Sequence, residues 1–242
     1  MTWRRFAPRR QKALKIQNLF SEFLGEREAR ELQCLDIGCG NGEIARHLTG
    51  YFGNIVALDN VFQLVREAYE KRPVVPMSLL QAEGIRLPFT SAAFDVVICA
   101  QVYEHMANVR QLPIEVERVL KPGGLCFFSG PNKMWPIEPH YRLPFLHWLP
   151  AKLAGLYMRA SGRGAQFDIR PLTYWHLRRL WERFTIYDCT MSVLHEPDRF
   201  GLPLSMSRLF RSMPSFLLKM FYFLIPNYNW VLVKPDEKEN PH

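Results

Sequence analysis

Along the first 130 residues, short continuous apolar runs alternate with segments in which apolar residues recur at helical spacing. The run FDVVICA (94–100) is uninterrupted and apolar, which is typical of a central strand in a parallel sheet. The pattern predicts strands at 32–37, 54–58, 78–81, 94–100, 125–129, 185–190 and 230–233, and helices at 9–24, 42–51, 61–71, 109–120 and 171–184. We expect the outer face of the first helix to be basic. The alternation predicts an α/β fold with a doubly wound, mostly parallel, seven-stranded sheet.

Two segments break this alternation. Residues 131–171 hold six prolines and many aromatic residues without a clean period, and residues 197–226 form a second apolar insertion. In the second insertion, Arg208, Arg211, Ser215 and Lys219 form a narrow polar stripe on an otherwise apolar helix, which Pro214 is expected to kink or divide. Two interpretations stay open: the insertions pack together as a lid over a substrate, or they contact an anionic membrane. Both favour an apolar or lipid-linked substrate.

Composition narrows the class of protein. Apolar residues make up 48% of the chain, enough for a sizeable core. We expect neither a transmembrane helix nor a secretory signal, and therefore a cytoplasmic protein that can associate with a membrane. The five cysteines show no CxxC spacing, so we expect buried reduced thiols, no disulfide framework and no metal site. The net charge of +8 favours an anionic partner, although excess charge for solubility explains it as well.

A glycine-rich turn, LDIGCGNGEIA (35–45), joins the first strand to the next helix. It lacks the lysine of a phosphate-binding loop, and its GxGxG spacing departs from the GxGxxG of dinucleotide sites. Asp36 disfavours a pyrophosphate there and favours a cation. Asp59 closes the second strand about 20 residues on, where an acid can accept hydrogen bonds from ribose hydroxyls. S-adenosylmethionine (SAM) combines a sulfonium, an ammonium and a free ribose, and so suits both acids.

Four motifs, in order, resemble the class I SAM-dependent methyltransferases, in particular their type 11 small-molecule group. They are LDIGCGNG (35–42), ALDN (57–60), QAEGIRLPFTSAAFDVVICAQVYEH (81–105) and ERVLKPGG (117–124). The resemblance covers about residues 32–130 and the last strand. It implies a Rossmann-like fold in one domain (1–242), with a helical cap at 1–30, a SAM-binding core at 31–130 and the two insertions around the acceptor.

The resemblance also assigns residues to SAM. It implies that Asp36 and Gly38 lie beside the methionine part, that Asp59 holds the ribose, and that Ala82 and Glu83 contact the adenine. Gln101 would begin the loop across the methyl-donor face. The full set of expected cofactor-binding residues is Asp36, Gly38, Gly40, Gly42, Asp59, Asn60, Ala82, Glu83 and Gln101.

Methyl transfer to a hydroxyl group also requires removal of a proton. The candidate bases are His105, in the YEH turn after the fourth strand, and His140, in PIEPHYRLP after the fifth. Packing beneath the cofactor is the alternative role for His105, and loop stabilisation is the alternative for His140. Parts of 131–150 also look like bacterial methyltransferases of lipid, glycan or quinone biosynthesis.

These patterns favour O-methylation of a small, apolar or lipid-linked acceptor. Three alternatives remain. One is a carbon methyltransferase of quinone or polyketide type, and another is a non-catalytic SAM-binding partner of a second subunit. The third, a nucleic-acid methyltransferase, is disfavoured because the segment after the fourth strand lacks the (D/N)PP(Y/F) motif of base-flipping enzymes.

Overall fold

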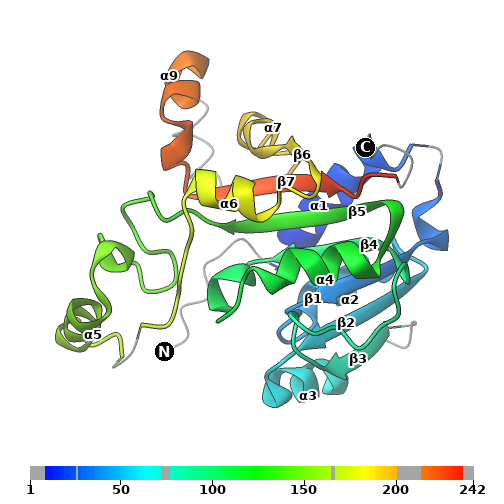
Figure 1. Cartoon of the computed structure of the whole chain (residues 1–242), viewed down its shortest axis with the longest axis horizontal. Helices are drawn as coiled ribbons and strands as arrows, with labels where there is room; N and C mark the ends of the chain where they lie inside the picture. The colour runs from blue at the N-terminus through cyan, green and yellow to red at the C-terminus, as the bar shows by residue number, and fades with distance from the viewer. Residues whose placement is uncertain (1–8, 26, 72–76, 165–166, 201–213, 237–242) are drawn as a thin grey trace, which may run out of the picture.

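The computed structural model describes residues 9–25, 27–71, 77–164, 167–200 and 214–236. Within this part of the chain, seven strands form one sheet in the order β3-β2-β1-β4-β5-β7-β6 (Figure 1). The strands are β1 (Gln33–Ile37), β2 (Asn54–Asp59), β3 (Met77–Gln81), β4 (Phe94–Ala100), β5 (Leu120–Pro131), β6 (Thr185–Asp188) and β7 (Asn227–Val233). Only β7 runs antiparallel to its neighbours in this sheet. The predicted doubly wound, mostly parallel sheet is confirmed.

Helices cover both faces of the sheet. The α-helices are α1 (Arg9–Phe23), α2 (Glu43–Leu48), α3 (Phe62–Glu70), α4 (Gln111–Val119), α5 (Ala151–Ala160), α6 (Tyr174–Leu180), α7 (Thr190–His195) and α9 (Ser215–Met220). Single 3-10 turns are η1 (Ala29–Glu31), η2 (Tyr103–His105), η3 (Leu146–Trp148) and η4 (Tyr222–Leu224). Among the described residues, no helix is both long enough and apolar enough to span a bilayer.

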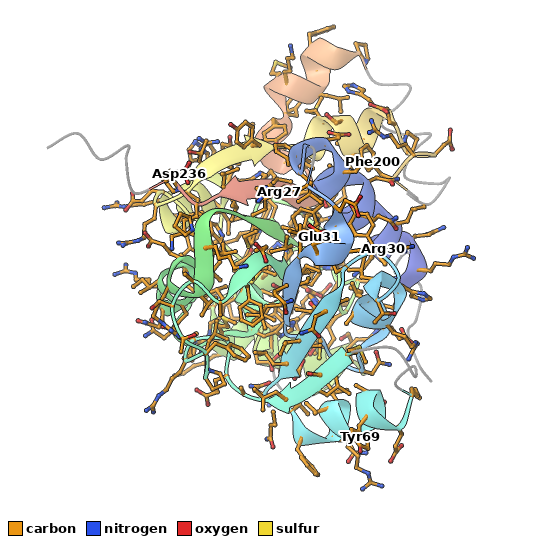
Figure 2. The ribbon with its side chains drawn as sticks, turned by 90° about the vertical axis from the view of Figure 1, so that its right-hand side faces the viewer. Arg27, Arg30, Glu31, Tyr69, Phe200 and Asp236 are labelled. Atoms are coloured by element: carbon orange, nitrogen blue, oxygen red, sulfur yellow. The ribbon has the colours of Figure 1, made fainter. Side chains whose placement is uncertain are left out.

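Successive strand residues face opposite sides of the sheet, and this divides the core in two. On β4, Val96 and Ile98 pack with α1 and α2, whereas Val97 and Cys99 pack with α4 and α6. Figure 2 shows Phe200 beside α1 on one side of the sheet, with Tyr69 marking α3 at the outer end next to β3. All four of these β4 side chains are buried, which explains why the strand reads as a continuous apolar run.

The first helix forms where predicted, but one of its faces was predicted wrongly. Ile16, Leu19 and Phe20 are buried, whereas Leu14 is 42% exposed. Lys15 points inward, and its Nζ donates to Oδ1 of Asn229 at 2.6 Å. Burial of this ammonium, with the neighbouring Lys12, lowers its pKa to about 7. The expected basic outer face is therefore incomplete, because the lysines turn toward the end of the sheet.

Each insertion contains a helix, and only the helix of the first insertion was not predicted from the sequence pattern. In the first, α5 packs through Ala154 and Met158 against Leu143 and Leu146, forming a small apolar cluster separate from the sheet core. In the second, α9 begins directly after Pro214. The segment before this proline lies outside the described residues, so the expected kink or division at Pro214 stays a prediction. The predicted polar stripe lies mostly outside the described residues, since Arg208, Arg211 and the Ser215 side chain are not among them.

Candidate active site at the carboxyl ends of the strands

The glycine turn leaves β1 in a conformation that side chains disfavour. Gly38, Gly40 and Gly42 have φ angles of +67°, +57° and +70°. A Cβ on Gly38 would lie 2.6 Å from Cγ2 of Val102, and a Cβ on Gly42 would lie 3.0 Å from Cβ of Ala68. Beside Gly40 no described atom lies within 4 Å of such a Cβ. Packing and backbone conformation thus require glycine at 38 and 42, whereas Gly40 exposes bare backbone to open space.

Asp59, at the end of β2, fastens this turn to the next strand. Its Oδ2 accepts from the backbone N–H of Gly40 at 2.8 Å, and its Oδ1 accepts from the N–H of Val61 at 3.0 Å. Its carbonyl oxygen accepts from the N–H of Ala82 at 3.1 Å. Asp59 therefore joins the glycine turn, the start of α3 and the segment after β3, three of the regions expected to surround a nucleoside.

Asp36 is a buried acid with unused hydrogen-bonding capacity. Its side chain is 2% exposed, and Oδ2 has no hydrogen-bond partner in the described structure. Burial raises its pKa to about 7; the Arg9 guanidinium opposes this shift and the Asp59 carboxylate adds to it. A cationic ligand beside this carboxyl group would restore its ionised form. The orphaned oxygen and the open backbone at Gly40 fit a positively charged ligand.

The other predicted cofactor residues reach the same edge to different extents. Ala82 lies next to Asp59, whereas the side chains of Asn60 and Glu83 are exposed. Gln101 adopts a left-handed φ of +63°, and its Nε2 donates to Oδ1 of Asn227 at 2.5 Å. A strained residue so tightly held is a frequent feature of functional loops. Gln101 thus ties the start of the loop after β4 to β7.

Both candidate bases lie in one cluster at this edge. Their imidazole rings meet edge to face, with centroids 5.4 Å apart between His105 and His140. Nδ1 of His140 and Oε1 of Glu138 are 2.8 Å apart, and Glu138 is buried. Desolvation raises the pKa of Glu138, but its hydrogen bonds to His140 and Tyr141 outweigh this and leave the pKa below its usual value. His105 and His140 are 35 residues apart in sequence. They lie close together because they follow β4 and β5, which are parallel neighbours in the sheet.

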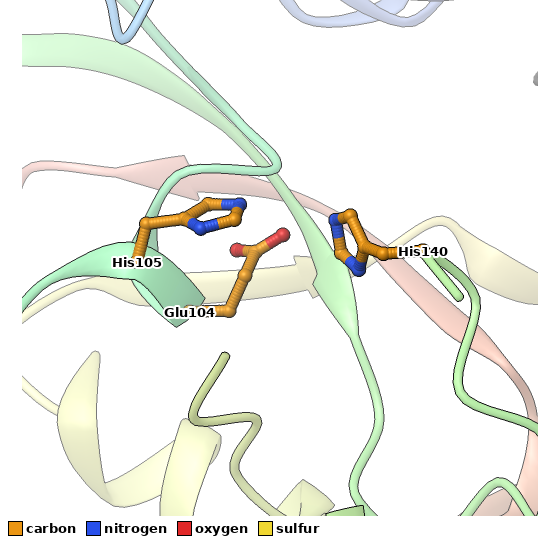
Figure 3. Close-up of side chains that lie close together, drawn as sticks. All are labelled: Glu104, His105 and His140. Atoms are coloured by element: carbon orange, nitrogen blue, oxygen red, sulfur yellow. The ribbon is translucent and has the colours of Figure 1, made fainter. Parts of the chain in front are cut away.

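Glu104 completes this cluster and was not predicted as a site residue. Figure 3 shows its carboxylate between the imidazoles of His105 and His140. It is 0% exposed, and neither carboxylate oxygen has a hydrogen-bond partner in the described structure. Burial raises its pKa to about 7, while the charges of His140 and Lys12 pull that pKa downward. One sequence signal could have identified Glu104: it is a charged residue next to a histidine in the otherwise apolar stretch VYEH (102–105).

A cavity of about 480 Å³ opens next to this cluster, between α5 and residues 167–170. Lys152, Arg159 and Arg170 give it a basic lining, with Asp168 and Phe167 among the other residues. The N–H of Arg170 donates to the carbonyl oxygen of Glu104 at 2.8 Å, which connects the wall of the cavity to η2. A ligand with an anionic part therefore fits the charge of this cavity.

Comparison with known proteins agrees with this geometry. Residues 35–128 match the type 11 family described as "Methyltransferase domain". The chain is 35% identical over 106 residues to the ubiquinone biosynthesis O-methyltransferase of Rickettsia canadensis (strain McKiel), an alignment covering 43% of this chain and 44% of that protein. The chain thus spans less than half the length of this relative.

Solved structures show the same fold. A SAM-dependent methyltransferase from Mesorhizobium loti superposes with a TM-score of 0.58 at 15% identity, covering 93% of this chain and 98% of the other. The phospholethanolamine N-methyltransferase 2 of Haemonchus contortus, solved with S-adenosylhomocysteine, gives a TM-score of 0.55 at 18% identity and covers 91% and 53%. Residues 35–128 thus match the methyltransferase domain of the type 11 group, and the sheet that they help to build has the fold of the SAM-dependent methyltransferases.

Proposed function

We propose that this chain transfers a methyl group from SAM to an oxygen atom of a small, apolar or lipid-linked acceptor. The observation that carries the proposal is the buried, unpaired carboxyl oxygen of Asp36 beside the bare backbone of Gly40. The Rickettsia relative, named as an O-methyltransferase, supports transfer to oxygen. When bound, SAM supplies a methyl group on a positively charged sulfur, which keeps the C–S electron pair as the acceptor oxygen forms its new C–O bond.

We assign the binding roles to residues at the ends of β1, β2 and β3. Asp36 would attract the positive charge of SAM, and the glycine turn at 38, 40 and 42 would lie against its methionine part. Asp59 already accepts two backbone N–H groups, and a carboxylate has capacity for further donors such as ribose hydroxyls. Ala82 and Glu83 would border the adenine, Asn60 the ribose, and Gln101 the methyl-donor face.

We assign activation of the acceptor hydroxyl to His140, with His105 beside it. Glu138 orients the His140 ring through its hydrogen bond, as carboxylates orient catalytic imidazoles in other enzymes. Loss of such activation costs typically 10²–10⁴-fold in rate. We therefore expect His140→Ala to lower turnover by about 100-fold or more while leaving SAM affinity nearly unchanged. Wild-type turnover in this variant would remove His140 from the mechanism.

We further propose that the insertions bring the site to an anionic membrane surface. On α5, Leu153 and Leu156 are 52% and 58% exposed, between the exposed cations Lys152 and Arg159. Phe145 and Trp148 are exposed just before this helix, and Phe216 and Met220 are exposed on α9. In Figure 1, α5 lies at the lower left and α9 projects upward above the left-hand end of β7. Exposed apolar residues flanked by cations suit an interfacial contact.

The decisive experiment identifies the acceptor. Purified protein is incubated with methyl-labelled SAM and cell extract, and the aqueous and lipid fractions are assayed for label. We expect label in a lipid or apolar fraction, and NMR of the product should show a methoxy group. A C-methyl product would favour the quinone or polyketide type of carbon methyltransferase. Absence of label in every fraction, from protein that binds SAM, would support a non-catalytic role.

A further inference from the structure

Glu104 presents a buried carboxylate whose two oxygens lack hydrogen bonds in the described structure. Ionised carboxylates are rarely buried in this way unless a cation or several donors satisfy them. The site is also rigid, because the backbone of η2 is anchored on both sides. The carbonyl of Glu104 accepts from Arg170, and the hydroxyl of Tyr103 donates to the carbonyl of Pro131 and accepts from the N–H of Leu172.

Two imidazoles converge on this carboxylate. One ligand atom each from Glu104, His105 and His140 lies within 4.8 Å of the others. In Figure 3 the three side chains point toward one another from η2 and from the loop after β5. Ligands on a tetrahedral zinc ion lie about 2.0–2.1 Å from the metal and hence roughly 3.4 Å apart. Because His105 is exposed, a small rotation of its side chain can close this difference.

The surroundings also match those of metal-binding histidines. Such a histidine usually donates its second ring N–H to a carboxylate, which fixes its orientation and tautomer. Glu138 occupies this position for His140, at 2.8 Å from Nδ1. The carboxylates of Asp168, Glu138 and Asp59 lie close enough to act electrostatically on His105.

The geometry points to a divalent transition-metal site formed by Glu104, His105 and His140, with zinc as the ion that two imidazoles and one carboxylate suit best. Three protein ligands leave at least one coordination position open, as in catalytic rather than structural zinc sites. The 23% exposure of the His140 side chain and the exposure of His105 leave the cluster accessible. This proposed site departs from the expectation, drawn from the spacing of the cysteines, that the chain binds no metal.

The role of the ion rests on the proposed function. An acceptor hydroxyl bound at the open position would lose its proton to water, with the O–H electron pair remaining on oxygen, because the metal lowers the pKa of the bound group. That oxygen could then accept the methyl group. In this scheme His105 and His140 activate the acceptor as ligands rather than as bases.

Metal binding is tested without SAM or an acceptor. Chelator-treated full-length protein is titrated with Zn²⁺ by calorimetry and with Co²⁺ by visible absorption. We expect one ion per chain and cobalt d–d bands of a four- or five-coordinate site, which azide should perturb by occupying the open position. Glu104→Gln and His140→Ala should weaken Zn²⁺ binding at least 100-fold. Glu138→Gln should weaken it roughly 10–100-fold.

The matched control is His176→Ala, which removes an exposed histidine of α6 that lies outside the cluster and is hydrogen-bonded to Thr173 at the start of that helix. It should bind Zn²⁺ as the wild type does. Circular dichroism establishes that each variant is folded, and a rise in melting temperature with Zn²⁺ in the wild type but not in Glu104→Gln gives a second readout. Absence of stoichiometric binding, or equal binding by wild type and Glu104→Gln, would overturn the site.

The two proposals fail separately. If Zn²⁺ binds as expected but no acceptor is methylated, the metal site stands and the proposed function falls. If chelated, metal-free protein methylates its acceptor at the full rate, the function stands and the catalytic role of the ion is refuted.

Discussion

The backbone N–H of Gly40 donates a hydrogen bond to Oδ2 of Asp59 at 2.8 Å. This contact joins the turn after β1 to the end of β2, and it holds the carboxylate next to the open backbone of Gly40. Because β1 and β2 are parallel and in register from Gln33 with Asn54 to Ile37 with Leu58, their carboxyl ends necessarily meet here. The relationship therefore pre-forms the part of the site that we assign to the ribose.

Replacing Asp59 tests that assignment. Asp59→Asn should weaken SAM binding roughly 10- to 100-fold, because hydrogen bonds to a charged group contribute about 1.5–3 kcal/mol. Isothermal calorimetry measures the change. The control is Asp95→Asn, since Asp95 also accepts a backbone N–H, from Gln33 at 3.0 Å, but at the other end of the sheet. Equal SAM affinity in Asp59→Asn and the wild type would exclude the ribose contact.

Gly38 tests how far packing and backbone conformation restrict the turn. Gly38→Ala should lower the free energy of unfolding by about 1–3 kcal/mol through left-handed strain, and further through the 2.6 Å contact with Val102. Gly25→Ala is the matched control, because Gly25 has a similar φ of +60° but open space around it. Urea unfolding should show the larger loss at position 38. Adding Val102→Ala should recover part of the difference; equal losses at 25 and 38 would contradict the predicted contact.

The raised pKa of Asp36 makes SAM binding depend on pH. Since this pKa is about 7 in the free protein, Asp36 is mostly protonated at pH 6 and cannot attract a cation there. The part of the SAM affinity that depends on Asp36 should be nearly constant above pH 8 and should fall toward tenfold per pH unit below 7. Asp36→Asn should bind more weakly and lose this dependence, leaving only the ionisation of SAM itself. An identical pH profile in the two proteins would argue against Asp36.

The same group affects stability in the opposite sense. The folded-state pKa of Asp36 lies above its usual value of 3.8, so the folded state holds the proton more tightly than the unfolded state. Its contribution to the free energy of unfolding is therefore complete below about pH 4 and is lost as the pH rises through 7. Comparing unfolding of the wild type and Asp36→Asn at pH 5 and pH 8, without ligand, measures this contribution.

Membrane contact is tested on α5. Leu153→Asp combined with Leu156→Asp should abolish co-sedimentation with anionic vesicles at low salt, because these two exposed side chains carry much of the apolar surface of that helix. Ile114→Asp, on α4, removes a comparably exposed apolar residue away from the insertions and should bind as the wild type does. If the wild-type protein fails to bind anionic vesicles, the proposed contact is wrong.

Local patterns predicted much of this architecture. The apolar run at 94–100 matches β4, because a strand that is buried on both faces is apolar throughout. The predicted helix at 61–71 contains α3, because a helix that is buried on one face has apolar residues at helical spacing. Irregular segments left no such trace. Helix α5 was missed since only Ala154 and Met158 of its ten residues are buried, against a small cluster that the insertion makes for itself.

The sequence by itself determined the seven strands, the glycine turn and the two acids that close β1 and β2, because each follows from neighbouring residues. Only the tertiary structure decided that Lys15 turns inward and that Glu104 lies between two histidines. Those facts depend on which strands are neighbours and on how α1 packs across their ends. Such contacts join residues that are far apart in the chain, so they cannot be predicted from the local spacing of apolar and polar residues.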